Sequence, residues 1–322
     1  MTWLVTGGAG FIGGHVTHAL LREGKDVVVL DDLSTGHRSS LASGAEFREG
    51  SLLERHVVDD AMSVRGLEGV VHIAGYKFAG ESVERPLHTY EQNVVGMWNL
   101  LDSMRSHAVR NIIFSSSAAV YGDVDVGVID EHQPTNPKSP YGESKLVGEW
   151  MLRDLALSDG FRHTSLRYFN VVGSREGGIG DQSPHSLLSL VFGAITRGAR
   201  PQIFGNDYLT DDGTCVRDYI PVGELADCHV AAAHLLSSGQ PLETAYNIGT
   251  GTGHSVAAVM AAVQGVTGIA FEPEILPRRE GDPAMVVASG ELAKRDLGWS
   301  PSGDLENMIR SAWDDYRSRG ES

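Results

Sequence analysis

The sequence is poor in cysteine and has no long apolar run. Cys215 and Cys228 are its only cysteines, which favours a reducing compartment, although a single disulfide between them stays open. No apolar stretch approaches the roughly 20 residues that cross a bilayer. The first strand-like run begins at residue 2, so we expect no signal peptide and a soluble, cytoplasmic protein without a membrane partner.

Basic residues are scarce relative to acidic ones. The chain has 26 lysines and arginines against 42 aspartates and glutamates, which gives a formal net charge of -16. Nucleic acids and anionic membranes attract basic surfaces, so this balance argues against either as a partner. His15 and His18 lie three residues apart, but no third ligand follows at a recognisable spacing. We therefore expect no metal site.

The first half of the chain alternates strand-like and helix-like segments. Strands are expected at 2–6, 26–30, 46–48, 69–73, 111–115 and 163–167, and helices at 11–23, 54–64, 83–106 and 141–157. A break near Pro86 in the third helix is left open. This alternation, with strands rich in Val, Ile and Leu, predicts an α/β fold with a doubly wound parallel sheet.

The composition and the pattern of predicted elements change after about residue 173. Stretches rich in Gly, Pro and Asp alternate there with shorter helices, as in a binding region built from long loops. We therefore expect one domain over residues 1–173 and a smaller C-terminal α/β substrate-binding domain over residues 174–322. Segments near 222–236 and 245–249 are regular enough to return to the first domain.

A glycine-rich loop follows the first apolar run. Gly7, Gly10 and Gly13 stand three apart and open a helical pattern. Such a loop lets the backbone approach a pyrophosphate and directs helix N–H groups at its charge. Asp31 ends the next strand, where its carboxylate would accept hydrogen bonds from ribose hydroxyls and repel a 2′-phosphate. The first domain is thus predicted to be a Rossmann-type domain that binds NAD, with Arg38 leaving NADP open.

Tyr141 and Lys145 stand four apart at the start of a predicted helix, so they share one face. A phenol with a pKa near 10 is a poor base, but a neighbouring ammonium and a bound positive nicotinamide favour the phenolate. Ser117 lies at a strand end, where open α/β sheets bind ligands, and could pass a hydroxyl proton to Tyr141. The three residues predict nicotinamide redox chemistry on a hydroxyl group.

Several longer motifs accompany these residues, at 6–13, 31–36, 77–83, 115–122, 141–145 and 167–170, and later at 204–208, 211–219 and 278–282. Together they resemble the extended short-chain dehydrogenase/reductase family, and within it the UDP-glucose (UDP-galactose) 4-epimerases. The resemblance covers nearly the whole chain. It implies an NAD-dependent isomerase of carbohydrate and galactose metabolism that interconverts UDP-glucose and UDP-galactose.

The resemblance also implies a mechanism and a set of site residues. Tyr141 takes the proton of the sugar 4-hydroxyl through Ser117, NAD accepts the C4 hydride, and the 4-keto sugar turns over before the hydride returns. Lys145 orients the nicotinamide ribose. Cofactor contacts are implied for Gly7, Gly10, Phe11, Ile12, Gly13, Asp31, Asp32, Ser51, Leu52, Lys77, Asn93, Ser115, Tyr141, Lys145 and Tyr168. Substrate contacts are implied for Ser116, Ser117, Tyr141, Asn170, Ser186, Leu187, Phe204, Arg217, Arg279, Asp282 and Val286.

Three positions depart from the family pattern. Ser51 stands where an Asp usually binds the adenine amino group, and Ser186 stands where an Asn commonly reaches the substrate. Val286 stands where the family varies between tyrosine and a small residue. A small side chain leaves room for an N-acetyl group at C2, so we expect UDP-GlcNAc and UDP-GalNAc to be accepted as well.

Three other functions compete with this interpretation. A 4,6-dehydratase needs an Asp-Glu pair where Ala118 and Ala119 stand, which argues against dehydration. An epimerase of another nucleotide sugar such as UDP-glucuronate stays open. A catalytically idle NAD-binding regulator is disfavoured because the three catalytic residues are all present.

The family dimerises through the helices predicted at 83–106 and 141–157, which implies a homodimer. Their apolar positions could form a shared face, or could simply pack on the chain's own sheet. These positions are Val94, Met97, Trp98, Leu101, Leu146, Trp150 and Leu155.

Overall fold

The computed structural model describes residues 1–124, 127–279 and 282–320. Within this part of the chain, seven parallel strands form a sheet in the order β10-β6-β5-β4-β1-β2-β3. The strands are β1 (Thr2–Thr6), β2 (Asp26–Asp31), β3 (Glu46–Glu49), β4 (Leu67–His72), β5 (Asn111–Ser117), β6 (Arg162–Tyr168) and β10 (Ala245–Ile248). The chain winds outward from β1 in both directions, which leaves a crevice at the carboxyl ends of the central strands. The predicted doubly wound sheet is confirmed.

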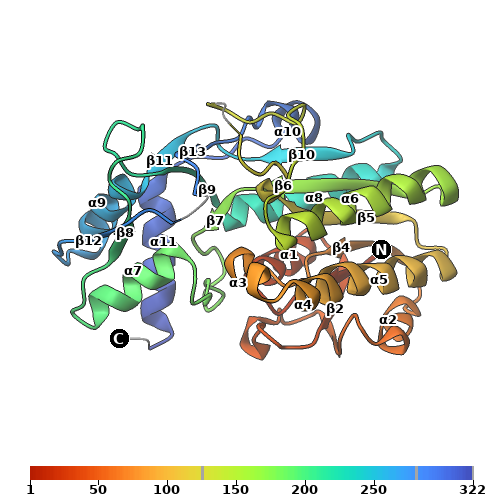
Figure 1. Cartoon of the computed structure of the whole chain (residues 1–322). Helices are drawn as coiled ribbons and strands as arrows, with labels where there is room; N and C mark the ends of the chain where they lie inside the picture. The colour runs from red at the N-terminus through yellow and green to blue at the C-terminus, as the bar shows by residue number, and fades with distance from the viewer. Residues whose placement is uncertain (125–126, 280–281, 321–322) are drawn as a thin grey trace.

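Helices cover both faces of this sheet (Figure 1). Trp3 and Leu4 are consecutive in β1 and point to opposite faces, yet both are fully buried. Apolar residues of α1, α8 and α10 pack on the face of Trp3, and those of α2, α5 and α6 on the face of Leu4. The helices are α1 (Phe11–Arg22), α2 (Arg55–Met62), α5 (Gly96–Ser106), α6 (Pro140–Asp159), α8 (Val222–Ser238) and α10 (Glu291–Leu297). Burial on both faces explains why the strands read as unbroken apolar runs.

The helix predicted over residues 83–106 is present from Pro86 onward. α4 (Pro86–Tyr90), a π-helical stretch η2 (Glu91–Val95) and α5 follow one another without a gap, and α3 (Ala79–Glu84) is a separate short helix before them. Pro86 is the first residue of α4, where its missing N–H costs no hydrogen bond. The break near Pro86 that the sequence left open is therefore present.

A smaller part of the molecule contains strands and helices from the second half of the chain, at the left of Figure 1. Its helices α7 and α11 bring Phe192, Trp313 and Tyr316 into one aromatic cluster, with ring centroids 5.1 to 5.7 Å apart. Its elements are β7 (Asn170–Val172), α7 (Leu187–Thr196), β8 (Gln202–Phe204), β9 (Val216–Pro221), β11 (Gly253–Ser255), α9 (Val256–Thr267), β12 (Glu274–Leu276), β13 (Met285–Val286) and α11 (Leu305–Ser318). Two short 3-10 turns, η1 (Arg38–Ser40) and η3 (Ala118–Val120), complete the described structure.

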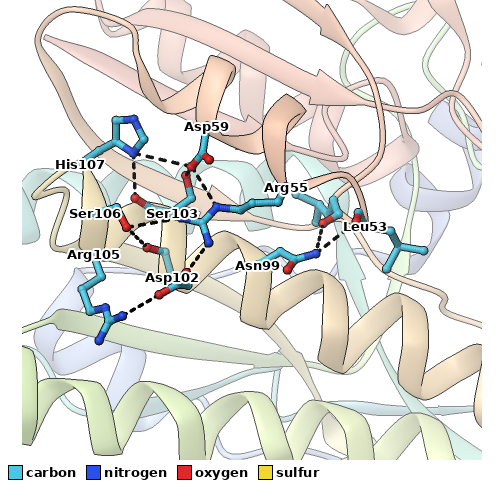
Figure 2. A network of polar contacts seen from close by, with 10 residues as sticks. Leu53, Arg55, Asp59, Asn99, Asp102, Ser103, Arg105, Ser106 and His107 are labelled. Carbon is cyan, nitrogen blue, oxygen red and sulfur yellow. Dashed lines mark hydrogen bonds and ion pairs between the residues drawn. The ribbon is translucent and has the colours of Figure 1, made fainter.

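A polar network fastens α2 to α5 (Figure 2). Arg55 donates to Asp59 at 2.9 Å and also pairs with Asp102, while Ser103 donates to Asp59 at 2.6 Å. Asn99, one turn earlier on α5, donates to the carbonyl oxygen of Leu52 at 2.9 Å. The network therefore holds the loop that contains Leu52 at the edge of the crevice.

Both cysteines are free and buried, so no disulfide joins Cys215 to Cys228. Among the described residues, no helix combines the length and apolar character needed to cross a membrane.

Candidate active site

A cavity of about 1530 Å³ runs along the carboxyl ends of the sheet strands and into the smaller part. Asp31, Ile73, Ser117 and Tyr168, each at or just after the end of a different sheet strand, line it. Loop residues after β7 and the start of α7 form the opposite wall. In an open α/β sheet this edge is where ligands bind, so the cavity is the candidate site.

The glycine-rich loop forms one end of this cavity and has the shape of a dinucleotide cradle. Gly7 has a φ of +73°, which favours glycine. A Cβ on Gly13 would lie 2.0 Å from the Gly7 carbonyl oxygen, so the helix can begin this close to the loop only with glycine there. Phe11 and Ile12 open α1, and their first-turn N–H groups have no acceptor within the helix. This end of the cavity therefore fits a pyrophosphate.

Asp31 lies where the ribose of a dinucleotide would sit. Its Oδ2 accepts from the N–H of Ala9 at 2.9 Å and its Oδ1 accepts from the N–H of Leu33 at 2.8 Å. Burial raises the pKa of Asp31, and these two bonds oppose the rise. Each carboxylate oxygen keeps a second lone pair, so the group can still accept from hydroxyls.

Arg38, whose positive charge left NADP open as an alternative cofactor, makes its contacts with other residues of this chain. It pairs with Glu49, and its guanidinium carbon lies 5.2 Å from the centroid of the Phe47 ring. Asp32 lines the cavity and accepts from the N–H of Ser34 at 2.9 Å. A 2′-phosphate would therefore meet two aspartates and a paired arginine, and this favours NAD.

Ser51 and Leu52, for which the family resemblance implies a contact with the cofactor, line the cavity just after β3. The Ser51 hydroxyl accepts from the N–H of Leu53 at 3.2 Å, so it stabilises its own turn. It is a shorter and weaker acceptor than the Asp that the family pattern has at this position.

The structure brings Tyr141, Lys145 and Ser117 together in the cavity wall. The α6 helix starts at Pro140 after Ser139, whose hydroxyl accepts from the N–H of Gly142, and this cap sets the direction of the catalytic face. The Lys145 Nζ lies 5.9 Å from the centroid of the Tyr141 ring and donates to the carbonyl oxygen of Ser115 at 2.8 Å.

The electrostatics of this set differ from the sequence expectation. Burial raises the pKa of the Tyr141 phenol, and the Ser117 hydroxyl acts in the opposite direction. Burial also lowers the pKa of Lys145 to about 8, since only 6% of the residue is exposed. The protein alone thus keeps the phenol protonated at neutral pH. The predicted lowering of its pKa requires a further positive charge in the cavity.

Ser115 and Ser116 do not line the cavity as Ser117 does. Ser115 offers its carbonyl oxygen to Lys145, and its link to a cofactor would run through that lysine. Ser116 lies on the other side of β5, is fully buried and donates to Glu149 at 2.6 Å. Consecutive strand residues alternate faces, so the implied substrate contact of Ser116 does not fit this arrangement.

Of the other implied cofactor residues, Lys77 and Tyr168 line the cavity, and Asn93 lies behind its wall. The Lys77 ammonium lies 3.6 Å from Asp181 across the cavity. Asn93 accepts from the N–H of Tyr76 at 2.6 Å and donates to the Ser144 hydroxyl at 2.9 Å. It therefore braces the turn after β4 against α6, and a direct cofactor contact by Asn93 stays a prediction.

The implied substrate residues gather at the other end of the cavity. Arg217 of β9 pairs with Asp282, and the guanidinium carbon of Arg279 lies 3.9 Å from the centroid of the Phe204 ring. The two arginines thus supply two cationic groups, and Phe204 supplies an aromatic face. This combination suits a diphosphate joined to a planar base. Asn170, Ser186 and Leu187 line the same end. Glu280 and Gly281 of the motif at 278–282 lie outside the described residues.

Val286 is not among the residues that line the cavity. It belongs to β13, which pairs with β9 so that Val286 stands opposite Arg217. Its side chain packs against a small cluster that contains Val120 and Tyr121. Any effect of Val286 on the sugar would therefore act from behind the substrate end.

Many residues that the sequence did not single out also line the cavity, among them Tyr76, Phe78, His88, Asp181 and His185. The Tyr76 ring stands edge-on to Phe78 at 5.2 Å and to His88 at 4.9 Å, and Phe78 lies 5.0 Å from His185. The aromatic residues on either side of Lys77 are a signal that could have drawn attention to them. The contact between Phe78 and His185 joins segments about 100 residues apart, so only the fold reveals it.

Asp218, next to Arg217, ties three segments together. It is fully buried, and its Oδ1 accepts from the N–H and the hydroxyl of Thr250 at 2.9 and 2.7 Å. Its Oδ2 accepts from the N–H groups of Gly251 and Ala288 at 3.1 and 3.2 Å. Burial raises the pKa of Asp218, and these bonds oppose the rise. The carboxylate thus fixes the strand that carries Arg217.

In the described ranges, no three His, Cys, Asp or Glu side chains gather in a way that could hold a metal ion.

Comparisons with known proteins agree with this geometry. A UDP-glucose 4-epimerase from Corynebacterium glutamicum is 43% identical over 318 residues, which cover 97% of this chain and 95% of that protein. A solved UDP-glucose-4-epimerase from Stenotrophomonas maltophila, with bound NAD and formylated UDP-arabinopyranose, superposes with a TM-score of 0.94 at 36% identity and covers 99% of both chains.

A solved UDP-glucose 4-epimerase from Brucella ovis, in complex with NAD, superposes with a TM-score of 0.93 at 38% identity over 98% of each chain. The model of the NAD dependent epimerase/dehydratase family matches residues 3–249. The match covers the glycine-rich loop, the Ser117–Tyr141–Lys145 set and the strand of Arg217 at once. This chain therefore belongs to the NAD dependent epimerase/dehydratase family.

Proposed function

We propose that this protein is an NAD-dependent UDP-hexose 4-epimerase that interconverts UDP-glucose and UDP-galactose through a 4-keto intermediate. One observation carries the proposal. A single cavity joins a dinucleotide cradle, the Ser117–Tyr141–Lys145 set and a cationic, aromatic end that suits a nucleoside diphosphate. The similar proteins from three bacteria are named for the same reaction.

The chain's own residues would hold NAD along the sheet edge. The N–H groups at the start of α1 face the pyrophosphate, and the Asp31 carboxylate accepts from the adenosine ribose. Lys77 and Tyr168 line the path between the cradle and the catalytic set. When bound, NAD supplies reversible acceptance of the sugar C4 hydride and adds the positive charge that Tyr141 needs.

Tyr141 and Ser117 move the proton of the 4-hydroxyl group. The phenolate oxygen of Tyr141 is the base, and the Ser117 hydroxyl bridges it to the sugar and lowers the pKa of the phenol. Lys145, held by the Ser115 carbonyl oxygen, stands beside the Tyr141 ring and favours its ionised form. The same phenol returns the proton when the sugar is reduced on its other face, so no net proton is consumed.

The opposite end of the cavity holds the UDP group. Arg217 and Arg279 pair with the diphosphate, and the Phe204 ring lies against the uracil. Asp282 orients the Arg217 guanidinium by pairing with one of its nitrogen atoms. Because this end recognises the nucleotide and leaves the hexose free to turn, both faces of C4 can be presented to the cofactor.

The sugar range follows from smaller side chains near the hexose. Val286 leaves more room behind the substrate end than a tyrosine would, which supports acceptance of UDP-GlcNAc and UDP-GalNAc. Ser186, at the start of α7, hydrogen-bonds to Ser189 at 2.8 Å and offers a short side chain where an Asn would reach the substrate.

The quaternary state is part of the proposal. Trp98 on α5 and Trp150 on α6 are 58% and 48% exposed, which is unusual for such large apolar side chains. Met97, Leu101 and Leu146 are buried in the chain's own core, so they serve the fold. We propose a homodimer whose interface is formed by the exposed tryptophan pair and its neighbours on these helices.

The wider setting is also proposed. The reaction would serve galactose metabolism, and the two free thiols fit the reducing environment of the cytoplasm. We further propose that residues 1–173, with α8 and β10, act as the NAD-binding domain and that the remaining residues act as the UDP-sugar-binding domain.

The direct experiment is to incubate the purified protein with UDP-galactose, with and without added NAD, and to follow UDP-glucose. UDP-GlcNAc and UDP-glucuronate are tested in parallel, and the ratio of rates identifies the preferred sugar. A Tyr141→Phe variant, which keeps the ring and removes the hydroxyl, should lose at least about a hundredfold in rate. Failure to convert any of these sugars, even with NAD present, would overturn the proposed function.

A further inference from the structure

A buried ion pair lies directly behind the catalytic set, and the proposed chemistry does not use it. Glu149 stands one turn after Lys145 on α6 and accepts from the Nε of Arg167 at 2.9 Å and from its Nη2 at 2.5 Å. Only 11% of the Glu149 side chain and 9% of the Arg167 side chain are exposed. A charged pair this deep, made bidentate by the guanidinium fork, needs a structural or functional reason.

The remaining hydrogen bonds of this pair reach further elements. The Arg167 Nη1 donates to the hydroxyl of Tyr121 at 2.8 Å, and that hydroxyl donates to Asn247 of β10 at 2.7 Å. Burial alone would lower the pKa of Arg167, but its bonds and charge interaction with Glu149 raise it above the ordinary value. The pair therefore stays ionised and joins α6, β6, the residue that follows η3, and β10.

The contact that bears on catalysis is the one with Ser116. The Ser116 hydroxyl donates to the Glu149 Oε1 at 2.6 Å, and Ser116 directly precedes Ser117 in β5. The preceding residue, Ser115, receives the bond from Lys145 at 2.8 Å. Two successive residues of β5 are thus attached to α6, the helix that carries Tyr141. These attachments hold the end of β5, which carries Ser117, against the helix that carries Tyr141.

We propose that Glu149 is a positioning residue that acts through Ser116 to hold Ser117 in line with Tyr141, with Arg167 fixing the Glu149 carboxylate. This inference rests on the proposed function, because the alignment matters only if a proton passes between Ser117 and Tyr141. Proton transfer is sensitive to small displacements of the donor and acceptor, so a loosened strand end lowers turnover without weakening nucleotide binding.

The test variant is Ser116→Ala, which removes one hydroxyl and leaves the ion pair intact. We expect kcat for UDP-galactose to fall about tenfold, while KM and the Kd for UDP stay within about twofold. The acid limb of the kcat–pH profile should move up by about half a pH unit, because Ser117 then lowers the pKa of Tyr141 less. Ser116→Thr, which restores a hydroxyl, should recover most of both effects.

The matched control is Ser165→Ala. Ser165 is also a fully buried serine, lies on the neighbouring strand β6, and its hydroxyl has no hydrogen-bond partner within the described residues. This variant should keep the parent kcat and pH profile. A second probe, Glu149→Met, removes both acceptor oxygens while keeping a side chain of similar length, so it should reproduce the pH shift, with urea unfolding recorded to measure its loss of stability.

The outcomes separate the two proposals. If the parent converts none of the nucleotide sugars, the proposed function fails. If the parent is active and Ser116→Ala matches Ser165→Ala in kcat and pH profile, the positioning role is overturned while the function stands. If Ser116→Ala instead raises the Kd for UDP and lowers stability, with an unchanged pH profile, its role is only structural and the inference is likewise overturned.

Discussion

The burial of Lys145 predicts how the free energy of unfolding depends on pH. Its pKa is lowered from 10.5 to about 8 because the ammonium is removed from water. In the unfolded chain the amine keeps its proton up to about pH 10.5, so unfolding takes up a proton between pH 8 and that value. The free energy of unfolding of the parent should therefore rise across this window, and at pH 7 the protein bears the full cost of the buried charge.

The magnitude follows from the difference between the two pKa values, which corresponds to about 3 kcal/mol. Lys145→Met removes the charge and fills similar space, but it leaves the Ser115 carbonyl oxygen without its donor, which costs about 1–2 kcal/mol. We therefore expect this variant to exceed the parent by about 1–2 kcal/mol at pH 7. At pH 10.5 it should fall below the parent by about the same amount.

The assay is urea unfolding of cofactor-free protein at both pH values, followed by tryptophan fluorescence. Lys294→Met, at an exposed position on α10, serves as the matched control and should change little with pH. The double difference cancels the titration of the other groups. A stability difference between Lys145→Met and parent that is the same at pH 7 and pH 10.5, within about 1 kcal/mol, would refute the reasoning. The variant should in any case lose at least about a hundredfold in turnover.

Three further predictions test other parts of the molecule. Gly13→Ala would push a methyl group against the Gly7 carbonyl oxygen, so NAD affinity measured by calorimetry should fall at least about tenfold, and an unchanged Kd would contradict the cradle. Val286→Tyr should lower the rate with UDP-GlcNAc by at least about tenfold and leave UDP-galactose within about threefold; equal inertness of parent and variant toward UDP-GlcNAc would remove the N-acetyl proposal. Trp98→Asp, alone or with Trp150→Asp, should turn the proposed dimer into monomers by light scattering at micromolar concentration, and a monomeric parent would count against the dimer.

Local patterns in the sequence predict the sheet and much of the site. The Gly7–Gly13 loop and the four-residue spacing of Tyr141 and Lys145 are set within a few neighbouring residues, so they can be read directly. The side of a strand is harder to predict, and the substrate contact implied for Ser116 rests on the family resemblance alone. Three consecutive serines carry no hydrophobic contrast that would show which of them faces the cavity.

Features that depend on tertiary burial could not be predicted. The raised pKa of Tyr141 comes from the depth of the cavity wall, which only the packing of α6 on β5 determines. Asn93 matched a family position, but its bonds to the turn after β4 depend on the π-helical stretch that replaces a regular helix there. The contact between Lys77 and Asp181 joins two distant segments and has no signature in either of them.

The turn at Gly249–Gly253 shows that a glycine-rich turn after a parallel strand does not by itself identify a nucleotide-binding site. Like the loop at Gly7, it follows a parallel strand, and the successive N–H groups of Thr250 and Gly251 point at one anion, as in other concave backbone turns. Here the anion is built in, since the Asp218 carboxylate occupies the hollow. The turn after β10 is therefore filled by the chain's own carboxylate, whereas the loop after β1 lines the cavity. Asp218 directly follows Arg217, so this built-in carboxylate restrains the strand that places the Arg217 guanidinium in the cavity wall.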